Sequence, residues 1–283
     1  MPRRRSTTTR TSSTPTTTPA SGHGVGEATR VLPPTRPRAR SSDPVLTFVA
    51  PAPRRAGATA SRWRMSYRTM DYARPPWLVF ASSREVYGHP ESLPAIEEAP
   101  LLPVDVYGRS KVEGERIVEV ARRNGLRVAI VRLSNIYGST CDYMDRVVPA
   151  FAHAAVLETA LRVDGHEYTF DFTHIDDNAA GIVALIDLLA VGEPAPPPIH
   201  LPTAHPTSLR QLAEFAVGLA DTRFAIEEAR PRSFDVSHFY GNLAHTREVL
   251  DWTPRTAIDE GLGRLIEDSR TELRVQHHTE AAL

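Results

Sequence analysis

The sequence predicts an α/β fold with a parallel sheet, and three consecutive segments carry this prediction. Trp77–Ala81 and Leu126–Leu133 are continuous apolar runs, as expected for strands that are buried on both faces. Between them, Tyr107–Gly125 has apolar residues at helical spacing and ends at a glycine, a residue that commonly terminates helices. A strand, a helix and a second strand form a βαβ unit, in which the two strands run parallel.

Further predicted elements continue this alternation. Helices are expected over Asp145–Thr159, Ala179–Ala190, Leu209–Leu219, Thr246–Leu250 and Ile258–Arg274, and short strands over Leu161–Val163, Tyr168–Phe172 and Ile199–Leu201. Asp176 or Asp177 is expected to cap the second of these helices. Thr207 or Ser208 is expected to cap the third.

The composition changes near residue 75. Residues 1–75 hold 14 arginines against 3 acidic residues, whereas residues 76–283 hold 19 basic and 31 acidic residues. The first part is rich in Ser, Thr and Pro, and its one short apolar run is Val45–Ala50, too little to offset the entropy of an ordered chain. We therefore predict that residues 1–75 are a disordered, basic, low-complexity segment, and we interpret them as a GC-rich gene read out of frame. The alternatives are a nucleic-acid-binding arm and a transit peptide.

Several classes of protein are excluded. A single cysteine, Cys141, rules out an internal disulfide and a cysteine-rich metal site, and no metal is expected. No apolar run approaches the length of about 18 residues that suggests a membrane span. The N-terminus lacks the apolar core of a secretory signal. We expect a cytoplasmic protein that does not bind nucleic acid.

Lys111 is the only lysine in the chain, and it follows Tyr107 by four residues. Residues at i and i+4 share one helix face, so the phenol and the ammonium are expected to point the same way. An ammonium lowers the pKa of a nearby phenol, and the phenolate can accept the proton of a secondary alcohol. Ser83 follows the first strand, at the end of a parallel sheet where ligands bind, and its hydroxyl can bond the reacting oxygen. These three groups suit the joint transfer of a hydride and a proton.

Motifs in a fixed order carry a family resemblance. They are Trp77–Gly88, the Y-G-R-S-K of Tyr107–Lys111, the R-L-S-N-I-Y-G of Arg132–Gly138, the D-F-T-H-I-D-D of Asp171–Asp177, and the tail segments Ser208–Leu212 and Arg247–Thr256. Residues 76 to about 270 thereby resemble the extended short-chain dehydrogenase/reductases, and within them the NAD-dependent sugar-nucleotide epimerases and dehydratases. The resemblance implies a Rossmann-like sheet over residues 76–145, with its N-terminal strands missing, and a smaller, mainly substrate-binding domain over residues 146–283.

The resemblance also implies a reaction, in which NAD oxidises the sugar of a nucleotide sugar at C4 and later returns the hydride. Tyr107 would be the general base, Lys111 its partner and a ligand of the cofactor ribose, and Ser83 the group that polarises the substrate hydroxyl. The family resemblance further implies a homodimer.

Three more residues acquire implied roles. Ser134 would lie beside the nicotinamide, and Asn135 would contact the substrate. Arg230 would pair with the substrate diphosphate, although its R-P-R-S differs from the usual R-P-G-D. His174 is expected to have a structural role instead.

Glu85, two residues after Ser83, bears on the type of reaction. A glutamate at this position is typical of the family's dehydratases and decarboxylases, where it fits a base for the C5 proton. Arg84 stands where dehydratases carry an aspartate. The alternative is a structural ion pair between Glu85 and an arginine.

One part of the family pattern is missing. The family opens with a strand and a G-x-x-G-x-x-G loop, whose backbone N–H groups hold the cofactor pyrophosphate. Residues 1–75 contain no such loop. The alternative function is therefore a catalytically inactive, truncated family member or a binding module, and Trp77–Ala81 is expected to become an exposed sheet edge.

Overall fold

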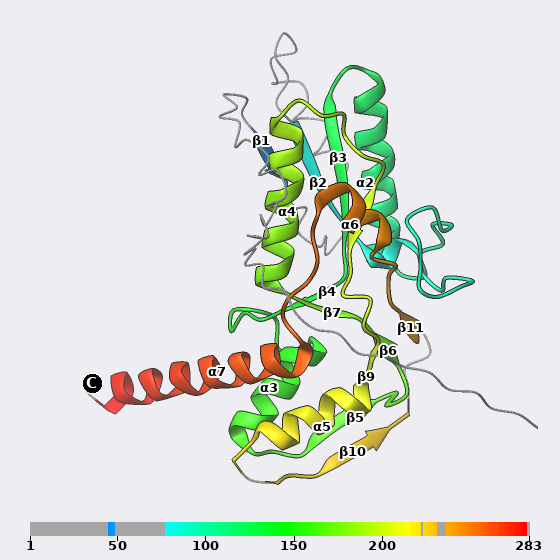
Figure 1. Cartoon of the computed structure of the whole chain (residues 1–283). Coiled ribbons are helices and arrows are strands. Elements are labelled where there is room, and N and C mark those ends of the chain that lie inside the picture. Colours follow the sequence, from blue (N-terminus) through cyan, green and yellow to red (C-terminus); the bar gives the residue numbers. More distant parts are fainter. Residues whose placement is uncertain (1–44, 49–76, 222, 231–235, 282–283) are drawn as a thin grey trace, which may run out of the picture. The chain divides into compact units, whose positions relative to one another are not determined.

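The computed structural model describes residues 45–48, 77–221, 223–230 and 236–281 (Figure 1). Its main sheet has the strand order β1-β2-β3-β8, and every neighbouring pair is parallel. These strands are β1 (Val45–Phe48), β2 (Trp77–Ser83), β3 (Arg127–Leu133) and β8 (Ile199–Leu201). Helix α2 (Val106–Arg123) connects β2 to β3. The predicted βαβ unit and parallel sheet are confirmed.

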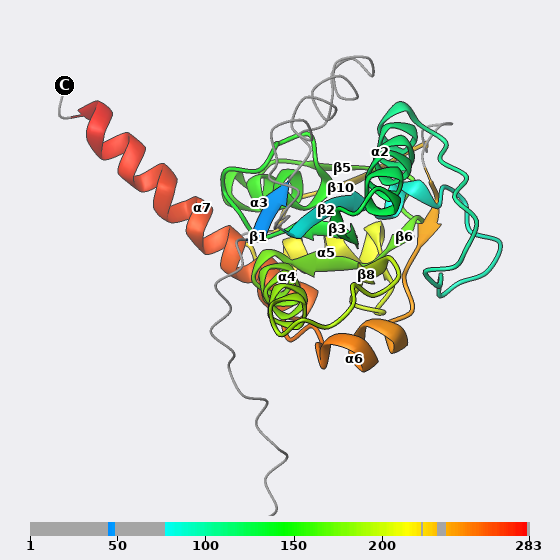
Figure 2. The same ribbon diagram turned by 90° about the horizontal axis from the view of Figure 1, so that it is seen from above.

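Successive residues of β2 enter two different cores. Leu78 and Phe80 pack with Val118 of α2 on one face of the sheet. Val79 packs with Leu185 of α4 (Ile175–Ala190) on the other. The two helices lie on opposite sides of the sheet (Figures 1 and 2). Burial on both faces explains why β2 reads as a continuous apolar run.

Strand β1 changes the environment of β2. It pairs with Trp77–Phe80, and β3 pairs with the other side of the same strand. The expectation that Trp77–Ala81 forms an exposed edge is therefore wrong. β1 lies within Val45–Ala50, the one apolar run that the sequence offers in residues 1–75. The rest of that segment lies outside the described residues.

A third core lies in the C-terminal part of the chain. It includes Phe151, Leu161, Leu212 and Leu265. Its elements are α3 (Val147–Leu157), β5 (Leu161–Asp164), α5 (Leu209–Leu219), β10 (Ile226–Ala229) and α7 (Ile258–Ala281), with β5 parallel to β10. The remaining elements are the 3₁₀ turn η1 (Arg84–Val86), β4 (Asn135–Tyr137), β6 (Thr169–Phe170), β7 (Phe172–His174), β9 (Thr207–Ser208), β11 (His238–Phe239) and α6 (Ala244–Leu250).

The expected strand Tyr168–Phe172 is in fact two strands with different partners. β6 pairs with β9 and β11, whereas β7 pairs with β4. Asp171 lies between them, where the chain passes from one small sheet to the other.

The two expected helix caps have different outcomes. Ser208 caps α5, as predicted, and it forms a capping box with Gln211. The cap of α4 is His174, whose Nδ1 accepts a hydrogen bond from the Asp176 amide, so the prediction of Asp176 or Asp177 is wrong. The carboxylate of Asp177 instead accepts the amides of residues 255 and 256, at 3.0 and 2.9 Å. His174 therefore has the structural role that the sequence predicts.

Candidate functional site

The carboxyl end of β2 and the first turn of α2 bring Ser83 and Tyr107 together. Asp105 caps α2 by accepting the Gly108 amide at 2.6 Å, and the helix therefore begins just before Tyr107. Ser83 is the last residue of β2, and its hydroxyl forms a hydrogen bond with the Tyr107 phenol. The sequence predicted this meeting of a strand end and a helix start.

Lys111 lies one turn further along α2, on the same face as Tyr107. Its Nζ is 5.4 Å from the centroid of the Tyr107 ring and donates a hydrogen bond of 2.8 Å to the Ala81 carbonyl. Only 4% of the residue is exposed. Burial lowers the pKa of Lys111 from 10.5 to about 8, and the negative charge of Glu115 opposes this effect.

The Tyr107 phenol lies between groups of opposite effect. Burial raises its pKa, and the negative charges of Glu85 and Asp105 add to the rise. The hydrogen bond with Ser83 and the positive charge of Arg146 lower the pKa. The phenol thus has a hydrogen-bond partner and a cation that favour its ionised form, but its desolvation is the largest effect.

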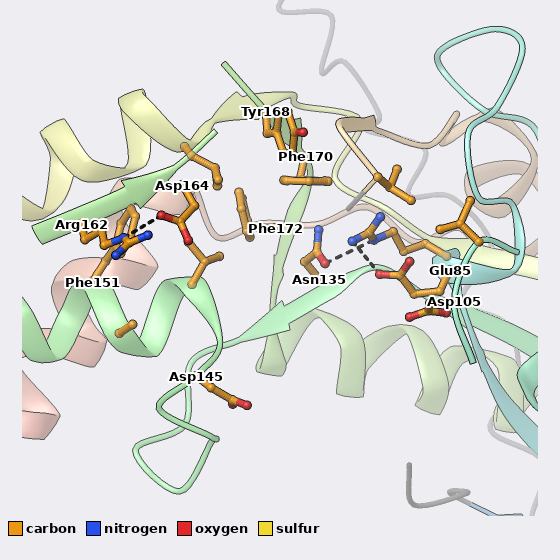
Figure 3. Close-up of a pocket in the computed structure, with 16 residues that line it drawn as sticks. Glu85, Asp105, Asn135, Asp145, Phe151, Arg162, Asp164, Tyr168, Phe170 and Phe172 are labelled. Carbon is orange, nitrogen blue, oxygen red and sulfur yellow. Dashed lines mark hydrogen bonds and ion pairs between the residues drawn. The ribbon is translucent and has the colours of Figure 1, made fainter. Parts of the chain in front are cut away.

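A cavity of about 450 Å³ is lined by Glu85 and Asp105, which stand two positions from Ser83 and from Tyr107 in the sequence (Figure 3). Ser83, Tyr107 and Lys111 are not themselves among the residues that line it. Figure 3 shows two polar ends with aromatic rings between them. One end carries Glu85, Asp105 and Asn135, the other carries Arg162 and Asp164, and Tyr168, Phe170 and Phe172 lie between. A concave surface with aromatic side chains and a few polar groups suits a small polar ligand such as a sugar.

Arg84 organises the polar end nearest to Ser83. Its Nη2 lies 2.7 Å from Glu85 Oε1, and its Nε donates to Asn135 Oδ1 at 3.3 Å. Its guanidinium carbon lies 4.9 Å from the ring centroid of Phe170 and 5.6 Å from that of Phe239. The ion pair that the sequence analysis held as the alternative for Glu85 is therefore present. The place of Arg84 among these rings was not predicted.

Asp171, the first residue of the D-F-T-H-I-D-D motif, has a role that the sequence did not predict. It is fully buried, and its carboxylate accepts hydrogen bonds from the Ser134 hydroxyl and, at 2.9 Å, from the Gly241 amide. Burial raises its pKa from 3.8 to about 7. Its backbone carbonyl also accepts a hydrogen bond from the side-chain Nδ2 of Asn135 at 3.2 Å. Asp171 thus binds Ser134 and Asn135, the two residues that follow β3. Its position between Phe170 and Phe172 in the sequence is the feature that could have marked it as a buried acid.

Two further predictions concern ligands. Arg230 is exposed just after β10 and is not among the residues that line the cavity. In the part of the chain that the structure describes, no three His, Cys, Asp or Glu side chains gather as metal ligands do. Within the same residues, no helix has the length and apolar character needed to cross a membrane.

Comparisons with known proteins agree with the fold. The chain is 30% identical to a putative UDP-glucose 4-epimerase of Methanocaldococcus jannaschii over 67% of its length. It is 28% identical to UDP-glucuronic acid decarboxylase 1 of Arabidopsis thaliana over 69% of its length. The solved structure of TunA, an NAD dependent NDP-hexosamine 5,6-dehydratase, matches with a TM-score of 0.61 and 27% identity, over 69% of this chain and 62% of that one.

The chain is shorter than these relatives. It spans 61% of the archaeal protein and 46% of the plant protein. The model of the NAD dependent epimerase/dehydratase family matches residues 54–195, half of the chain, and this range includes β2, α2, β3 and all of α4. By this match, and in agreement with the motifs at Ser83 and Tyr107–Lys111, the chain belongs to the NAD dependent epimerase/dehydratase family.

Proposed function

We propose that this chain is a nucleotide-sugar epimerase or dehydratase that acts by transient oxidation of the sugar at C4. The observation that carries the proposal is the grouping of the Ser83 hydroxyl, the Tyr107 phenol and the buried Lys111 ammonium at the end of β2. Glu85 and Asp105, close to them in the sequence, line a cavity. The names of the relatives, which are enzymes of UDP-sugars and NDP-hexosamines, support the substrate class.

In this proposal, Tyr107 is the general base. As a phenolate it takes the proton of the C4 hydroxyl, while Ser83 hydrogen-bonds the same oxygen and orients it. Lys111 favours the phenolate by its positive charge, at 5.4 Å from the ring. In the epimerase reaction, the ketone at C4 regains the hydride on carbon and the proton of Tyr107 on oxygen, which restores the alcohol and the phenolate.

The residues present fit the catalytic end of NAD. NAD, when bound, accepts the hydride from C4 and returns it. The buried ammonium of Lys111 and the phenol of Tyr107 lie together as needed to bond a ribose hydroxyl, and Ser134 follows the neighbouring strand β3. A glycine-rich loop for the pyrophosphate is absent from residues 1–75. We therefore expect the chain to hold NAD weakly.

The substrate would occupy the cavity beside Ser83. Asn135 lines this cavity, held by Arg84 and by the Asp171 carbonyl, and is proposed to contact the sugar. Arg230 is proposed to meet the diphosphate from the exposed end of β10. Residues 76–145 would then be the remaining part of the NAD-binding domain and residues 146–283 mainly the substrate-binding domain. A homodimer is part of the same proposal.

Glu85 divides the possible reactions. It lines the cavity and is paired with Arg84, so it is either a base for the C5 proton or a structural anion. If it is a base, the C5 hydrogen exchanges with solvent and Glu85→Gln abolishes this exchange but spares oxidation at C4. If it is structural, both processes decline together.

The direct test is product analysis by proton NMR. The chain is incubated in D₂O with millimolar NAD and UDP-glucose, with UDP-glucuronic acid in a parallel sample. We expect a new C4 epimer, or an elimination or decarboxylation product, and the hydrogen from C4 should be retained because the hydride returns without exchange. An unchanged substrate in both samples contradicts the proposal.

A second candidate is a binding module for nucleotide sugars, and the missing glycine-rich loop favours it. Calorimetric titration with UDP-glucose separates the two. Binding without any product at millimolar NAD identifies the binding module, whereas binding with turnover identifies the enzyme.

A further inference from the structure

Lys111 has an acidic neighbour that the proposed reaction does not use. Glu115 lies one turn along α2 from Lys111, and 6% of it is exposed. Lys111 donates to the Ala81 carbonyl, and the Glu115 carboxylate accepts from the hydroxyl of the next residue, Ser82. The ammonium and the carboxylate therefore meet adjacent positions at the end of β2, on the same side of α2.

Glu115 is itself fixed by a buried arginine. Arg132 of β3 donates to the two Glu115 oxygens, through Nε at 2.9 Å and Nη2 at 2.8 Å. Its Nη1 donates to the Tyr87 hydroxyl at 2.9 Å and to the Glu97 carbonyl at 2.7 Å. A bidentate pair with a guanidinium fixes a carboxylate in one orientation.

We propose that Glu115 is a positioning residue for Lys111, whose carboxylate, clamped by Arg132, keeps the ammonium charged and directed toward the end of β2 beside Tyr107. Its importance for catalysis rests on the proposed function, but the coupling of the two side chains does not. Without a fixed anion, desolvation would favour neutral Lys111, which has no charge with which to stabilise a phenolate.

Several described groups lie near Lys111. On α2 they are Tyr107 and Glu115, and from β2 the Phe80 ring lies 5.7 Å from Nζ. Arg132 of β3 stands behind Glu115, together with Tyr87 and Glu97. Among these groups, Glu115 is the one whose negative charge raises the pKa of Lys111 against the effect of burial.

The test uses the fact that Lys111 is the only lysine in the sequence. Growth with ¹³C-lysine, and a tag without lysine, gives one ¹³Cε resonance, whose shift is followed from neutral to strongly alkaline pH. The wild-type midpoint is expected near 8. In Glu115→Gln the midpoint should be lower by about one pH unit or more, because an adjacent opposite charge is lost.

Two variants make the result specific. Glu113→Gln removes an exposed acid from the same helix, and it should leave the midpoint unchanged. Glu115→Asp keeps the charge on a shorter stem and should give a midpoint between those of the wild type and Glu115→Gln; it also serves if Glu115→Gln does not fold. The proposal is overturned if Glu115→Gln folds and keeps the wild-type midpoint. If only Glu115→Asp folds, the wild-type midpoint in that variant overturns it. Since no turnover is measured, failure here is distinct from failure of the proposed function.

Discussion

Replacement of Tyr107 by phenylalanine is expected to reduce turnover of a nucleotide sugar by about 10²–10⁴-fold, the range for loss of a positioned acid or base. The ring remains beside Lys111, but no oxygen is left to take the proton from C4 or to bond Ser83. The phenol is part-buried, and its hydroxyl has one described side-chain hydrogen-bond partner, Ser83. The free energy of unfolding should therefore change little. The rate is measured at millimolar NAD, with the NMR assay described above.

Tyr143→Phe is the matched control for this experiment. Tyr143 is 76% exposed, and the same loss of a hydroxyl there should leave turnover unchanged. If Tyr107→Phe keeps more than about a tenth of the wild-type rate, the loss is smaller than that expected for a general base, and Tyr107 does not have this role.

Replacement of Arg132 by methionine should have the largest effect on stability, a loss of about 3–5 kcal/mol in the free energy of unfolding. The side chains of Arg132 and Glu115 are only 5% and 7% exposed. Without the guanidinium, the Glu115 carboxylate remains buried and, among the described residues, keeps Lys111 as a nearby cation. Urea unfolding, followed by the fluorescence of the buried Trp77 and Trp252, measures the change.

Two further variants separate burial from pairing. The double variant Arg132→Met/Glu115→Met should recover most of the stability, since both charges leave together. Arg122→Met breaks the exposed pair of Arg122 with Glu119 and should cost about 0–1 kcal/mol. A double variant that is no more stable than Arg132→Met shows that packing, not the unpaired charge, causes the loss.

The sequence predicted the parts of the site that follow from local periodicity. Tyr107 and Lys111 share a face because they stand four residues apart on one helix. Ser83 meets Tyr107 because β2 ends where the first turn of α2 begins. The catalytic roles proposed for these residues come from the resemblance to the family.

The sequence did not predict contacts that depend on packing between distant segments. Arg132 and Glu115 stand 17 positions apart on a strand and a helix, and neither spacing nor composition marks them as a pair. Asp177 was one of the predicted helix caps, but its carboxylate accepts hydrogen bonds from the amides of residues 255 and 256. His174 caps the helix instead. In each case tertiary contacts decided between groups that are locally equivalent.

We propose that this chain carries catalytic residues of its family, whereas residues 1–75 lack the glycine-rich loop that holds the cofactor pyrophosphate in that family. Backbone N–H groups and the helix dipole behind such a loop normally stabilise that pyrophosphate. The most direct measurement is a titration of the purified chain with NADH, followed by nicotinamide fluorescence. We expect no saturation of NADH binding in the micromolar range. Saturable micromolar binding would contradict it, and would mean that residues 1–75 or a partner chain complete the nucleotide site.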